Sequence, residues 1–460
     1  MKQDTICALA TANGIGAIGV IRISGDDALS VVQRSFPAKD LSVQKSHTVH
    51  YGYFMDREEV IDEVMMAIFL APKSFTTENS VEISFHGSPH IGKKILETLI
   101  KNGARMAKAG EFTMRAFMNG RIDLSQAEAI ADIIASENEA SRKVAMSQLK
   151  GGVSQEISVL RNDLLNFVSL IELELDFAEE DVEFADRTAL VQLLHKIETK
   201  LKSLIDTFQY GNAIKSGVAV AIIGKPNAGK STLLNALLKE ERAIVSDIAG
   251  TTRDTIEEVL HIKGNAFRLI DTAGLRETAD EIEKIGVAKA REKVNSAEVL
   301  VYLADANSND FSEDIDLLKS ILREDLKVII CATKIDEVLP TKFIQIEEAF
   351  RKEIVSDFDF ITISAVENQN IQDLKNELSS YVEHLKSESN VVITNQRHYE
   401  ALRKSIDAVY RVKEAISHQI STELLAYELK NALEYLGEIS GEFTNDEVLG
   451  NIFSKFCIGK

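Results

Sequence analysis

Cysteine is scarce in this chain of 460 residues. Its three cysteines, Cys7, Cys331 and Cys457, are odd in number and far apart, which argues against a disulfide framework and against a four-ligand zinc site. Long apolar runs are missing as well, because no uncharged apolar stretch approaches the roughly 20 residues that a membrane-spanning helix requires. The first residues, MKQDTICALATANG, lack the apolar segment of a signal peptide. We therefore expect a soluble, cytoplasmic protein with reduced thiols.

Basic residues are outnumbered by acidic ones. With 52 lysines and arginines against 72 aspartates and glutamates, the net charge of −20 opposes a broad, non-specific grip on a nucleic-acid backbone. A nucleic-acid substrate would therefore need a local basic patch or a partner protein. One candidate patch runs over residues 92–121, and an ordinary solvated surface is the alternative explanation. Its basic residues are Lys93, Lys94, Lys101, Arg105, Lys108, Arg115 and Arg121, against Glu97 and Glu111.

Proline is scarce too, with five residues, and two long stretches lack it. Residues 122–210 and the last 70 residues predict helices, with apolar side chains three and four residues apart. The first 118 residues instead hold β-rich runs such as IGVIRIS, EVMMAIFL and SVEISFHG between turns. Residues 216–380 alternate β-rich runs, such as GVAVAIIG and VLVYLAD, with helical segments, which predicts a mostly parallel sheet wrapped by helices.

These patterns predict a multidomain protein. We expect an α+β domain at residues 1–118 and a helical-bundle domain built from residues 119–215 and 381–460. An α/β domain at residues 216–380 is expected to be inserted between the two helical parts.

A phosphate-binding motif lies in this inserted segment. GKPNAGKS, at residues 224–231, matches G-x-x-x-x-G-K-[ST] and lies between a predicted strand and the predicted helix STLLNALLK. Its backbone N–H groups and the helix N-terminus can surround phosphates, Lys230 can reach the outer ones, and the Ser231 hydroxyl suits Mg²⁺. The context therefore favours a nucleotide site.

Further motifs point to guanine. Asp271-Thr-Ala-Gly274 offers a carboxylate for the metal's water and a glycine N–H toward the γ-phosphate. Asp336 of TKID can pair with the N1–H and exocyclic amine of guanine, and Ser364-Ala365 would complete the base pocket. We therefore predict an α/β P-loop GTPase domain. Thr333 stands where the guanine motif usually has Asn, and its shorter side chain is expected to weaken the clamp on the base.

The group that orients the attacking water is less clearly marked. Leu275 follows Gly274, where Ras-like enzymes place a glutamine. The nearest carboxylates are Asp280, Glu281 and Glu283, each of which can also be an ordinary surface acid.

No arginine finger is identified, and a monovalent cation is a candidate substitute. The Asn227 amide oxygen can help hold such a cation against the phosphates. Ser246, Ile248 and Thr251 would supply further oxygens, and Thr252 would complete the Mg²⁺ shell. The residues predicted to contact GTP are Asn227, Ala228, Gly229, Lys230, Ser231, Thr232, Ser246, Asp247, Ile248, Ala249, Gly250, Thr251, Thr252, Asp271, Thr272, Ala273, Gly274, Thr333, Lys334, Asp336, Ser364 and Ala365.

Three apparent motifs are set aside. Gly14, Gly16 and Gly19 match G-x-G-x-x-G, but the strand-like run VIRIS follows instead of a helix. The second motif is the pair His86 and His90, which could bind a metal from one helix face. Gly-Ser-Pro lies between the two histidines, so no helix presents both to a metal. The chain ends in FSKFCIGK, and its final lysine argues against a prenylation signal.

The ordered set of motifs resembles the MnmE (TrmE) family of bacterial and organellar tRNA modification GTPases over essentially the whole chain. The segments that carry this resemblance are DTICALAT, GEFTMRAFMNGRIDLSQAEA, GKPNAGKS, DIAGTTRDT, DTAGLRETADEIEKIG and the terminal FCIGK.

The resemblance implies a homodimer with an N-terminal folate-binding and dimerisation domain, a helical domain and an inserted G domain. With an FAD-binding partner of the MnmG (GidA) type, such proteins install an aminomethyl-type (carboxymethylaminomethyl) group on carbon 5 of the wobble uridine of certain tRNAs. A tetrahydrofolate derivative, 5-formyl or methylene, supplies the one-carbon unit. The family pairs its G domains when GTP and K⁺ are bound, and its water-positioning glutamate matches Glu283.

The resemblance also implies a folate site. Arg22, Glu82, Arg121 and Lys460 match the family's folate-site positions. The two arginines can pair with folate carboxylates and the glutamate can accept from pterin N–H groups, although each can also be a structural charge. The tail is expected beside this site, anchored by Phe453 and Phe456. Cys457 in that tail is either a thiol used in the modification chemistry or a small buried packing residue.

Two other functions stay open from the sequence. The chain can be a regulatory GTPase of ribosome assembly, although its C-terminal region offers helices and no basic RNA-binding appendage. It can also be a folate-dependent aminomethyltransferase with an ancillary nucleotide domain.

Overall fold

The computed structural model describes residues 4–176, 186–239, 258–270, 286–386, 389, 391–418 and 420–459. The chain forms two compact units, each with a six-stranded sheet. The first consists of Met1–Ala135, Ala145–Ile197 and Ala401–Lys460, and the second of Ser136–Val144 and Glu198–Glu400. The predicted multidomain fold class is confirmed.

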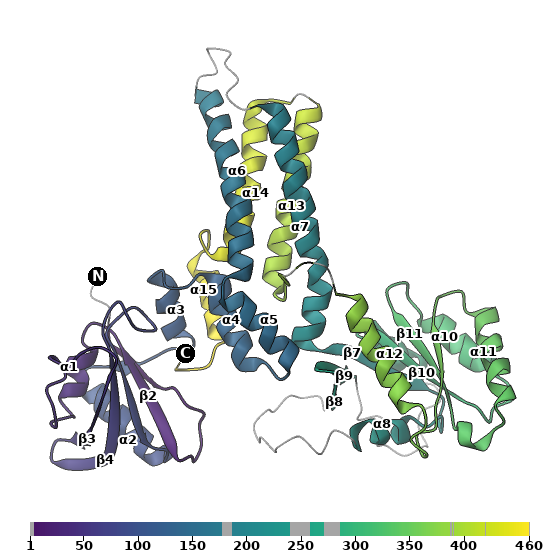
Figure 1. Cartoon of the computed structure of the whole chain (residues 1–460), viewed down its shortest axis with the longest axis horizontal. Helices are drawn as coiled ribbons and strands as arrows, with labels where there is room; N and C mark the ends of the chain where they lie inside the picture. Colours follow the sequence, from purple (N-terminus) through teal and green to yellow (C-terminus); the bar gives the residue numbers. More distant parts are fainter. Residues whose placement is uncertain are drawn as a thin grey trace. The chain divides into compact units, whose positions relative to one another are not determined.

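The first unit begins with a mixed sheet, drawn in purple in Figure 1. Strand β6 runs parallel to β1, and the other neighbouring strands are antiparallel. In sheet order the strands are β3 (Thr48–Asp56), β4 (Glu59–Phe69), β5 (Ser80–His86), β2 (Ile18–Ser24), β1 (Ile6–Leu9) and β6 (Arg105–Met106).

The two faces of this sheet have different surroundings because side chains alternate along each strand. Ile21, Ile83 and Met66 point into a core shared with helices α1 (Ala28–Gln33) and α2 (Pro89–Lys101). On the other face, beyond Glu82 and Arg22, the β3 side chains Val49, Tyr51 and Tyr53 are 63%, 63% and 53% exposed. We call these three residues, together with Met65 of β4, the open sheet face.

Long helices complete the first unit. Helices α6 (Gly152–Asp176) and α14 (Thr422–Ser440) lie side by side (Figure 1), and Lys430 of α14 pairs with Glu172 of α6. The predicted apolar stripe of α6 is buried, including Leu160, Leu164 and Val168. The other helices outside the second sheet are α3 (Glu111–Met118), α4 (Leu124–Ala135), α5 (Glu139–Leu149), α7 (Arg187–Ser216), α13 (Gln396–Ser417) and α15 (Asp446–Ser454).

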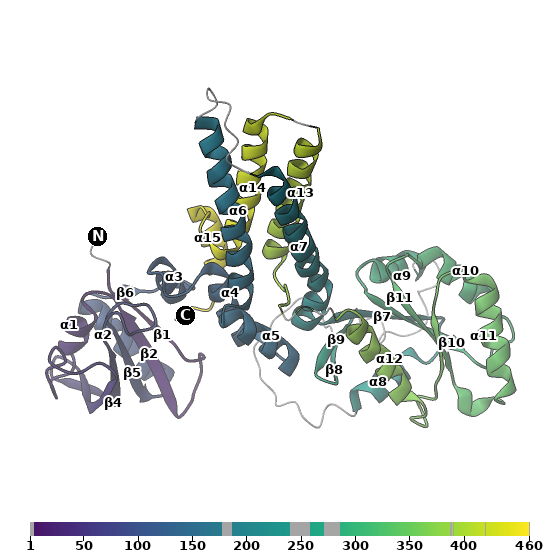
Figure 2. The ribbon, with the colours of Figure 1, turned by 45° about the horizontal axis from the view of Figure 1, so that its top comes forward.

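The last helix closes on the start of the helical segment. Phe453 and Phe456 are buried with Leu124 and Ala127 of α4, and the Phe453 ring lies 6.5 Å from that of Phe117. Helix α15 therefore packs against α3, as Figure 2 shows. The expected anchoring of the tail by both phenylalanines is confirmed.

The second unit is a three-layer α/β structure. Its strands are parallel except β8, which is antiparallel to β9. In sheet order they are β12 (Asp359–Thr362), β11 (Lys327–Thr333), β10 (Val299–Asp305), β7 (Val218–Gly224), β9 (Asn265–Leu269) and β8 (Glu258–Ile262). The helical elements are α8 (Lys230–Lys239), α9 (Gly286–Asn295), α10 (Ser312–Ile321), the short 3₁₀ helix η3 (Ile335–Glu337), α11 (Thr341–Glu353) and α12 (Ile371–His384).

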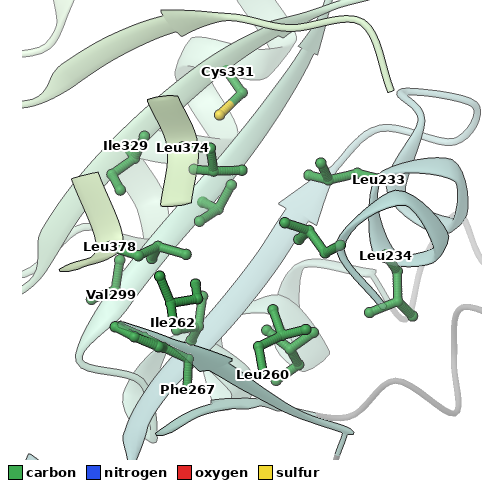
Figure 3. Packing of buried hydrophobic residues seen from close by; sticks show 14 of the residues in the cluster. Leu233, Leu234, Leu260, Ile262, Phe267, Val299, Ile329, Cys331, Leu374 and Leu378 are labelled. Atoms are coloured by element: carbon green, nitrogen blue, oxygen red, sulfur yellow. The ribbon is translucent and has the colours of Figure 1, made fainter. Parts of the chain in front are cut away.

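Both faces of this sheet are buried, which explains why its strands are continuously apolar. Val299 and Val301 of β10 face one core with Leu233 of α8 and Leu374 of α12 (Figure 3). The alternate residue Leu300 faces a second core, to which α9, α10 and α11 contribute. Parallel strands of this kind end at one edge, where ligands bind in such folds.

Candidate functional site

The phosphate motif forms the turn between β7 and α8. Asn227 and Gly229 have φ angles of 64° and 92°, in the left-handed region. Residues in such conformations turn successive N–H groups toward one point, which creates an anion site ahead of the N-terminus of α8. Asn227 is exposed at the tip of the loop, and Ala228 is buried beneath it.

Lys230 lies folded over its own loop. Its Nζ donates to the carbonyl oxygens of Gly224 at 2.6 Å and Lys225 at 2.7 Å. Burial, and next the like charge of Lys293, lower the pKa of Lys230. A phosphate placed here would neutralise that repulsion, so the loop fits an anionic ligand.

The opposite side of the loop is fixed to the sheet. Lys225 pairs with Glu313 and Asp314 of α10, each at 2.9 Å. Asp314 is buried and also accepts a hydrogen bond of 2.8 Å from the Tyr302 hydroxyl. These contacts hold the start of the loop against β10 and α10.

Thr333 connects the guanine motif to the phosphate loop. It ends β11, is buried, and its hydroxyl lies 2.9 Å from the Ala228 carbonyl oxygen and 3.2 Å from that of Ala304. Lys334 next to it has a φ of 59° and donates to Asp305 at 2.6 Å. Burial alone would raise the pKa of Asp305, but hydrogen bonds from Lys334 and the Asn307 N–H lower it below its ordinary value.

Asp336 follows in η3, and its side chain is exposed. Ser364 lies two residues after the end of β12 and is fully buried, with its hydroxyl accepting from the Glu367 N–H at 3.2 Å. Because β7, β11 and β12 are parallel, their three following segments meet at the same edge of the sheet. The described part of the predicted nucleotide site is thus assembled from segments about 140 residues apart in the sequence, Asn227 to Ala365.

Several predicted residues lie outside the described residues. They are Ser246, Asp247, Ile248, Ala249, Gly250, Thr251, Thr252, Asp271, Thr272, Ala273, Gly274, Glu283 and Lys460.

In the first unit, Arg22 and Glu82 lie opposite each other on β2 and β5. The guanidinium donates to one Glu82 carboxylate oxygen at 2.9 and 2.7 Å. Its carbon lies 5.2 Å from the centre of the Phe75 ring and 5.8 Å from that of Phe112. The sequence interpretation paired Arg22 with a folate carboxylate, whereas here it is already paired with Glu82.

Arg121 reaches the same aromatic ring. It lies 4.9 Å from the centre of Phe75 and donates to the Phe75 carbonyl oxygen at 2.6 Å. Two guanidiniums therefore flank one phenyl ring, with a single carboxylate beside them. Burial, and next the charge of Arg22, lower the pKa of Arg121.

The candidate basic patch over residues 92–121 is corrected by the structure. Arg115 is buried and bonded to Asp4, Glu78 and Glu111. Arg105 also pairs with Asp4 and Glu111. The lysines of α2 pair with acids too, in the pairs Lys93–Glu97, Lys94–Glu59 and Lys101–Asp56. Five of the seven basic residues are therefore paired with acids, some of them distant in the sequence and two, Glu97 and Glu111, within the stretch itself.

The chain's tail lies against the N-terminal sheet. Ile458 forms a β-bridge with Ala109, and the Gly110 N–H donates to the Cys457 carbonyl oxygen at 3.4 Å. A Cβ on Gly459 would lie 2.2 Å from the Leu9 carbonyl oxygen, and this glycine has a φ of 95°. The tail therefore passes so close to the end of β1 that a side chain larger than that of glycine does not fit at position 459. Cys457 is exposed, so its interpretation as a buried packing residue was wrong.

Sequence reasoning missed Phe75 and Glu78. Both belong to the loop between β4 and β5, where no period and no motif marks a residue as functional. The one usable signal was an aromatic residue followed by polar ones in SFTTEN, which is too common to be informative.

Among the described residues, no helix combines the length and the apolar character needed to cross a bilayer.

Two family models match the chain. One is described as "GTP-binding protein TrmE N-terminus" and matches residues 5–121; the other, "MnmE helical domain", matches residues 124–457. Among curated proteins, the tRNA modification GTPase MnmE of Flavobacterium johnsoniae is 51% identical over 100% of both chains. That of Cytophaga hutchinsonii is 49% identical, over 99% of this chain and 98% of its own, and that of Porphyromonas gingivalis is 48% identical, over 100% and 98%.

Solved structures align more weakly. The GDP complex of a GTP-binding protein from Sulfolobus solfataricus covers 65% of this chain and 78% of its own, at 16% identity and a TM-score of 0.29. A likeness this low does not bear on the fold, which rests on the sheet topology described above.

Proposed function

Because this chain belongs to the MnmE family of tRNA modification GTPases, we propose that it uses GTP hydrolysis to install a carboxymethylaminomethyl-type group on carbon 5 of the wobble uridine of certain tRNAs. The observation that supports this most is the pairing of two sites in one chain. A phosphate loop with a guanine-reading aspartate lies in one unit, and the Arg22–Glu82–Phe75–Arg121 group lies in the other. A regulatory GTPase alone would need only the first.

We propose that GTP binds along the edge of the second sheet. Asn227 to Thr232 would surround the phosphates, and the exposed Asp336 carboxylate would accept from the guanine N1–H and amine. Ser231, with Thr252, would hold the Mg²⁺ that accompanies the nucleotide. The other residues that the sequence predicts to contact GTP are proposed to do so as well.

We propose K⁺ as the ion that stabilises developing charge on the phosphates. Asn227 is exposed at the loop tip, where its amide oxygen is free to turn toward the phosphates. Ser246, Ile248 and Thr251 would complete the ligand set. Glu283 is proposed to position the attacking water, in place of a glutamine after Gly274.

We propose that a tetrahydrofolate derivative binds beside Arg22, Glu82 and Arg121, with Lys460 as a further contact. When bound, it supplies the one-carbon unit. The residues present fit such a ligand, since Phe75 offers a flat aromatic surface and Arg121 has no ion-pair partner among the described residues. Glu82, already held by Arg22, keeps one carboxylate oxygen for pterin N–H groups. The exposed Cys457 is retained as a candidate for the modification chemistry.

We propose a homodimer formed through the open sheet face. A contiguous exposed group of Val49, Tyr51, Tyr53 and Met65 is typical of a protein interface.

An FAD-binding protein of the MnmG type is the proposed second partner and would carry the flavin. The four-segment division at residues 118, 215 and 380 is retained as the proposed domain organisation.

The experiment that tests the proposed function is nucleoside analysis of tRNA from cells that lack the gene. We expect unmodified wobble uridine, restored by the wild-type chain and not by Lys230→Ala or by Arg22→Ala. Lys39→Ala, an exposed lysine outside both sites, serves as the control. Normal wobble uridine in the deletion strain, together with a defect in ribosomal subunit assembly, would favour the regulatory alternative.

A further inference from the structure

An open pocket of about 610 Å³ is lined by Phe75, the ring that Arg22 of the Arg22–Glu82 pair also contacts. It lies where the loop between β4 and β5 meets the segment after α3. Phe69, Pro72 and Phe75 form its apolar surface, and Lys73 and Arg121 contribute positive charge. No aspartate or glutamate is among the described residues that line it. In a chain with a net charge of −20, an acid-free pocket with two cations is a distinctive environment.

The nearby acids are engaged elsewhere. Glu78, in the same loop, is buried against Arg115, and Glu82 is bonded to Arg22. Neither Lys73 nor Arg121 has an ion-pair partner among the residues that the structure describes. Asn119 donates to the Thr76 carbonyl oxygen at 2.7 Å, which holds the pocket loop in place. Lys73 on the pocket loop and Arg121 in the segment after α3 thus present two positive charges on segments that Asn119 ties together, and neither has a counter-ion among the described residues.

We propose that this pocket binds a chain of γ-linked glutamate carboxylates, so that the protein prefers polyglutamylated folates over the monoglutamate. This inference rests on the proposed folate function and extends it to the ligand's tail. The volume lies within the range of small-molecule sites, roughly 300–1,000 Å³. Phe75 contacts both Arg22 and the pocket, so a ligand held at Glu82 can cross this ring and place its carboxylates near Arg121 and Lys73.

The test measures the affinity of the full chain for 5-formyl-tetrahydrofolate with one and with three glutamates, by isothermal titration calorimetry. We expect the wild type to bind the triglutamate about five-fold or more tightly, since an exposed ion pair contributes a factor of up to about five. Lys73→Ala removes one of the two cations, so it should reduce this ratio about two-fold or more and change the monoglutamate affinity less than about two-fold. Lys73→Glu should bring the ratio to one or below. Lys39→Ala, which removes an exposed lysine that does not line the pocket, should retain the wild-type ratio.

The outcomes separate the two proposals. If neither folate binds the wild type, the folate function itself fails. If the monoglutamate binds and the ratio is one, or if Lys73→Ala keeps the wild-type ratio, the tail pocket is wrong and the folate site stands. The affinity for tRNA is measured on the same variants. If Lys73→Ala leaves the ratio of triglutamate to monoglutamate affinity unchanged but weakens tRNA binding, these cations bind nucleic acid and the proposal is overturned.

Discussion

At the scale of single residues, the Thr333 hydroxyl links two loops that are distant in the sequence. It lies within hydrogen-bond distance of the carbonyl oxygen of Ala228 in the phosphate loop. Thr333→Val removes this bond and keeps the shape of the side chain, so we expect the dissociation constants of GTP and GDP to rise about five- to ten-fold, as for a hydrogen bond of about 1 kcal/mol. Thr333→Ser, which keeps the hydroxyl, should bind like the wild type. Equal nucleotide affinities for the valine and serine variants would show that the contact has no role in binding.

Asn227 carries a second prediction at this scale. Its φ of 64° places it at the loop tip, and its side chain is exposed. We expect the GTPase rate to be at least about ten-fold higher in K⁺ than in Na⁺ for the wild type, and Asn227→Ala to reduce that difference to about two-fold or less. Steady-state phosphate release in the two salts measures both values. A wild-type rate that is the same in Na⁺ and in K⁺ would contradict the proposed cation.

Single residues were predictable from the sequence where a motif fixes their chemistry at a set spacing. Lys230 and Asp336 are of this kind in their place in the fold, since Lys230 begins α8 and Asp336 lies in η3 after β11, while their roles in binding stay predictions. The exposure of Cys457 was not predictable, since a small thiol is compatible with either environment. The engagement of Arg22 with Glu82 depends on strand register, which places residues 60 positions apart side by side.

At the scale of elements, the docking of the tail depends on backbone contact. A side chain at position 459 would meet the Leu9 carbonyl oxygen. We therefore expect Gly459→Val to displace the tail and to abolish tRNA modification, as should deletion of residues 457–460, while K⁺-stimulated GTP hydrolysis persists. Gly450→Ala in α15, where a Cβ meets no atom within 4 Å, is the matched control. Nucleoside analysis and GTPase assays of these variants give the answer, and normal modification by the truncated chain would show that the tail is dispensable.

The ion cluster that joins the chain's start to β6 and α3 predicts a pH dependence. A hydrogen bond from Arg105 lowers the pKa of Asp4 below its ordinary 3.8. Burial alone would raise the pKa of Glu111, but hydrogen bonds from Arg105, the Lys108 N–H and Arg115 leave it below 4.5. Folded-state pKa values below the unfolded ones mean that this stabilisation is complete above about pH 5 and is lost as the pH falls through the folded values.

We therefore expect protection of β6 and α3 in hydrogen exchange, corrected for the intrinsic effect of pH, to fall below about pH 4. Arg105→Gln should flatten this dependence, because the carboxylates then lose their charged partner. Protection that stays constant down to pH 3 in the wild type would contradict the assignment.

Elements were predictable where burial imposes a clear pattern. The strands of the second sheet are buried on both faces and form continuous apolar runs, so β7 and β10 matched their predicted segments. Strand β3 was not anticipated, because its exposed face carries Val49, Tyr51 and Tyr53 and so hides the alternation of a half-buried strand. Strand β8 was missed for another reason, since its apolar run is only Val259 and Leu260 long before His261 ends it.

At the scale of the whole molecule, the open sheet face predicts the oligomeric state. We expect the wild type to be a dimer and Tyr51→Arg to shift it toward monomer, because two like charges would then meet in a dry interface. Within one chain the new arginine lies beside Glu63, the residue to which the Tyr51 hydroxyl now donates, so the sheet should remain folded. Val355→Arg, at a fully exposed site in the second unit, is the control. Molar mass from light scattering measures the effect, and an unchanged dimer for Tyr51→Arg would place the interface elsewhere.

The open sheet face also has a consequence for inheritance of mutations. In a dimer with two-fold symmetry the same patch occurs on both chains, so one codon change alters the interface twice. A substitution that costs about 1 kcal/mol per chain would weaken the dimer by about 2 kcal/mol, or roughly 30-fold, whereas a mixed dimer with one native chain would lose only about five-fold. In a cell that makes both versions, native chains would therefore rescue variant ones by pairing with them, and such mutations at Val49, Tyr51 or Tyr53 would behave as recessive.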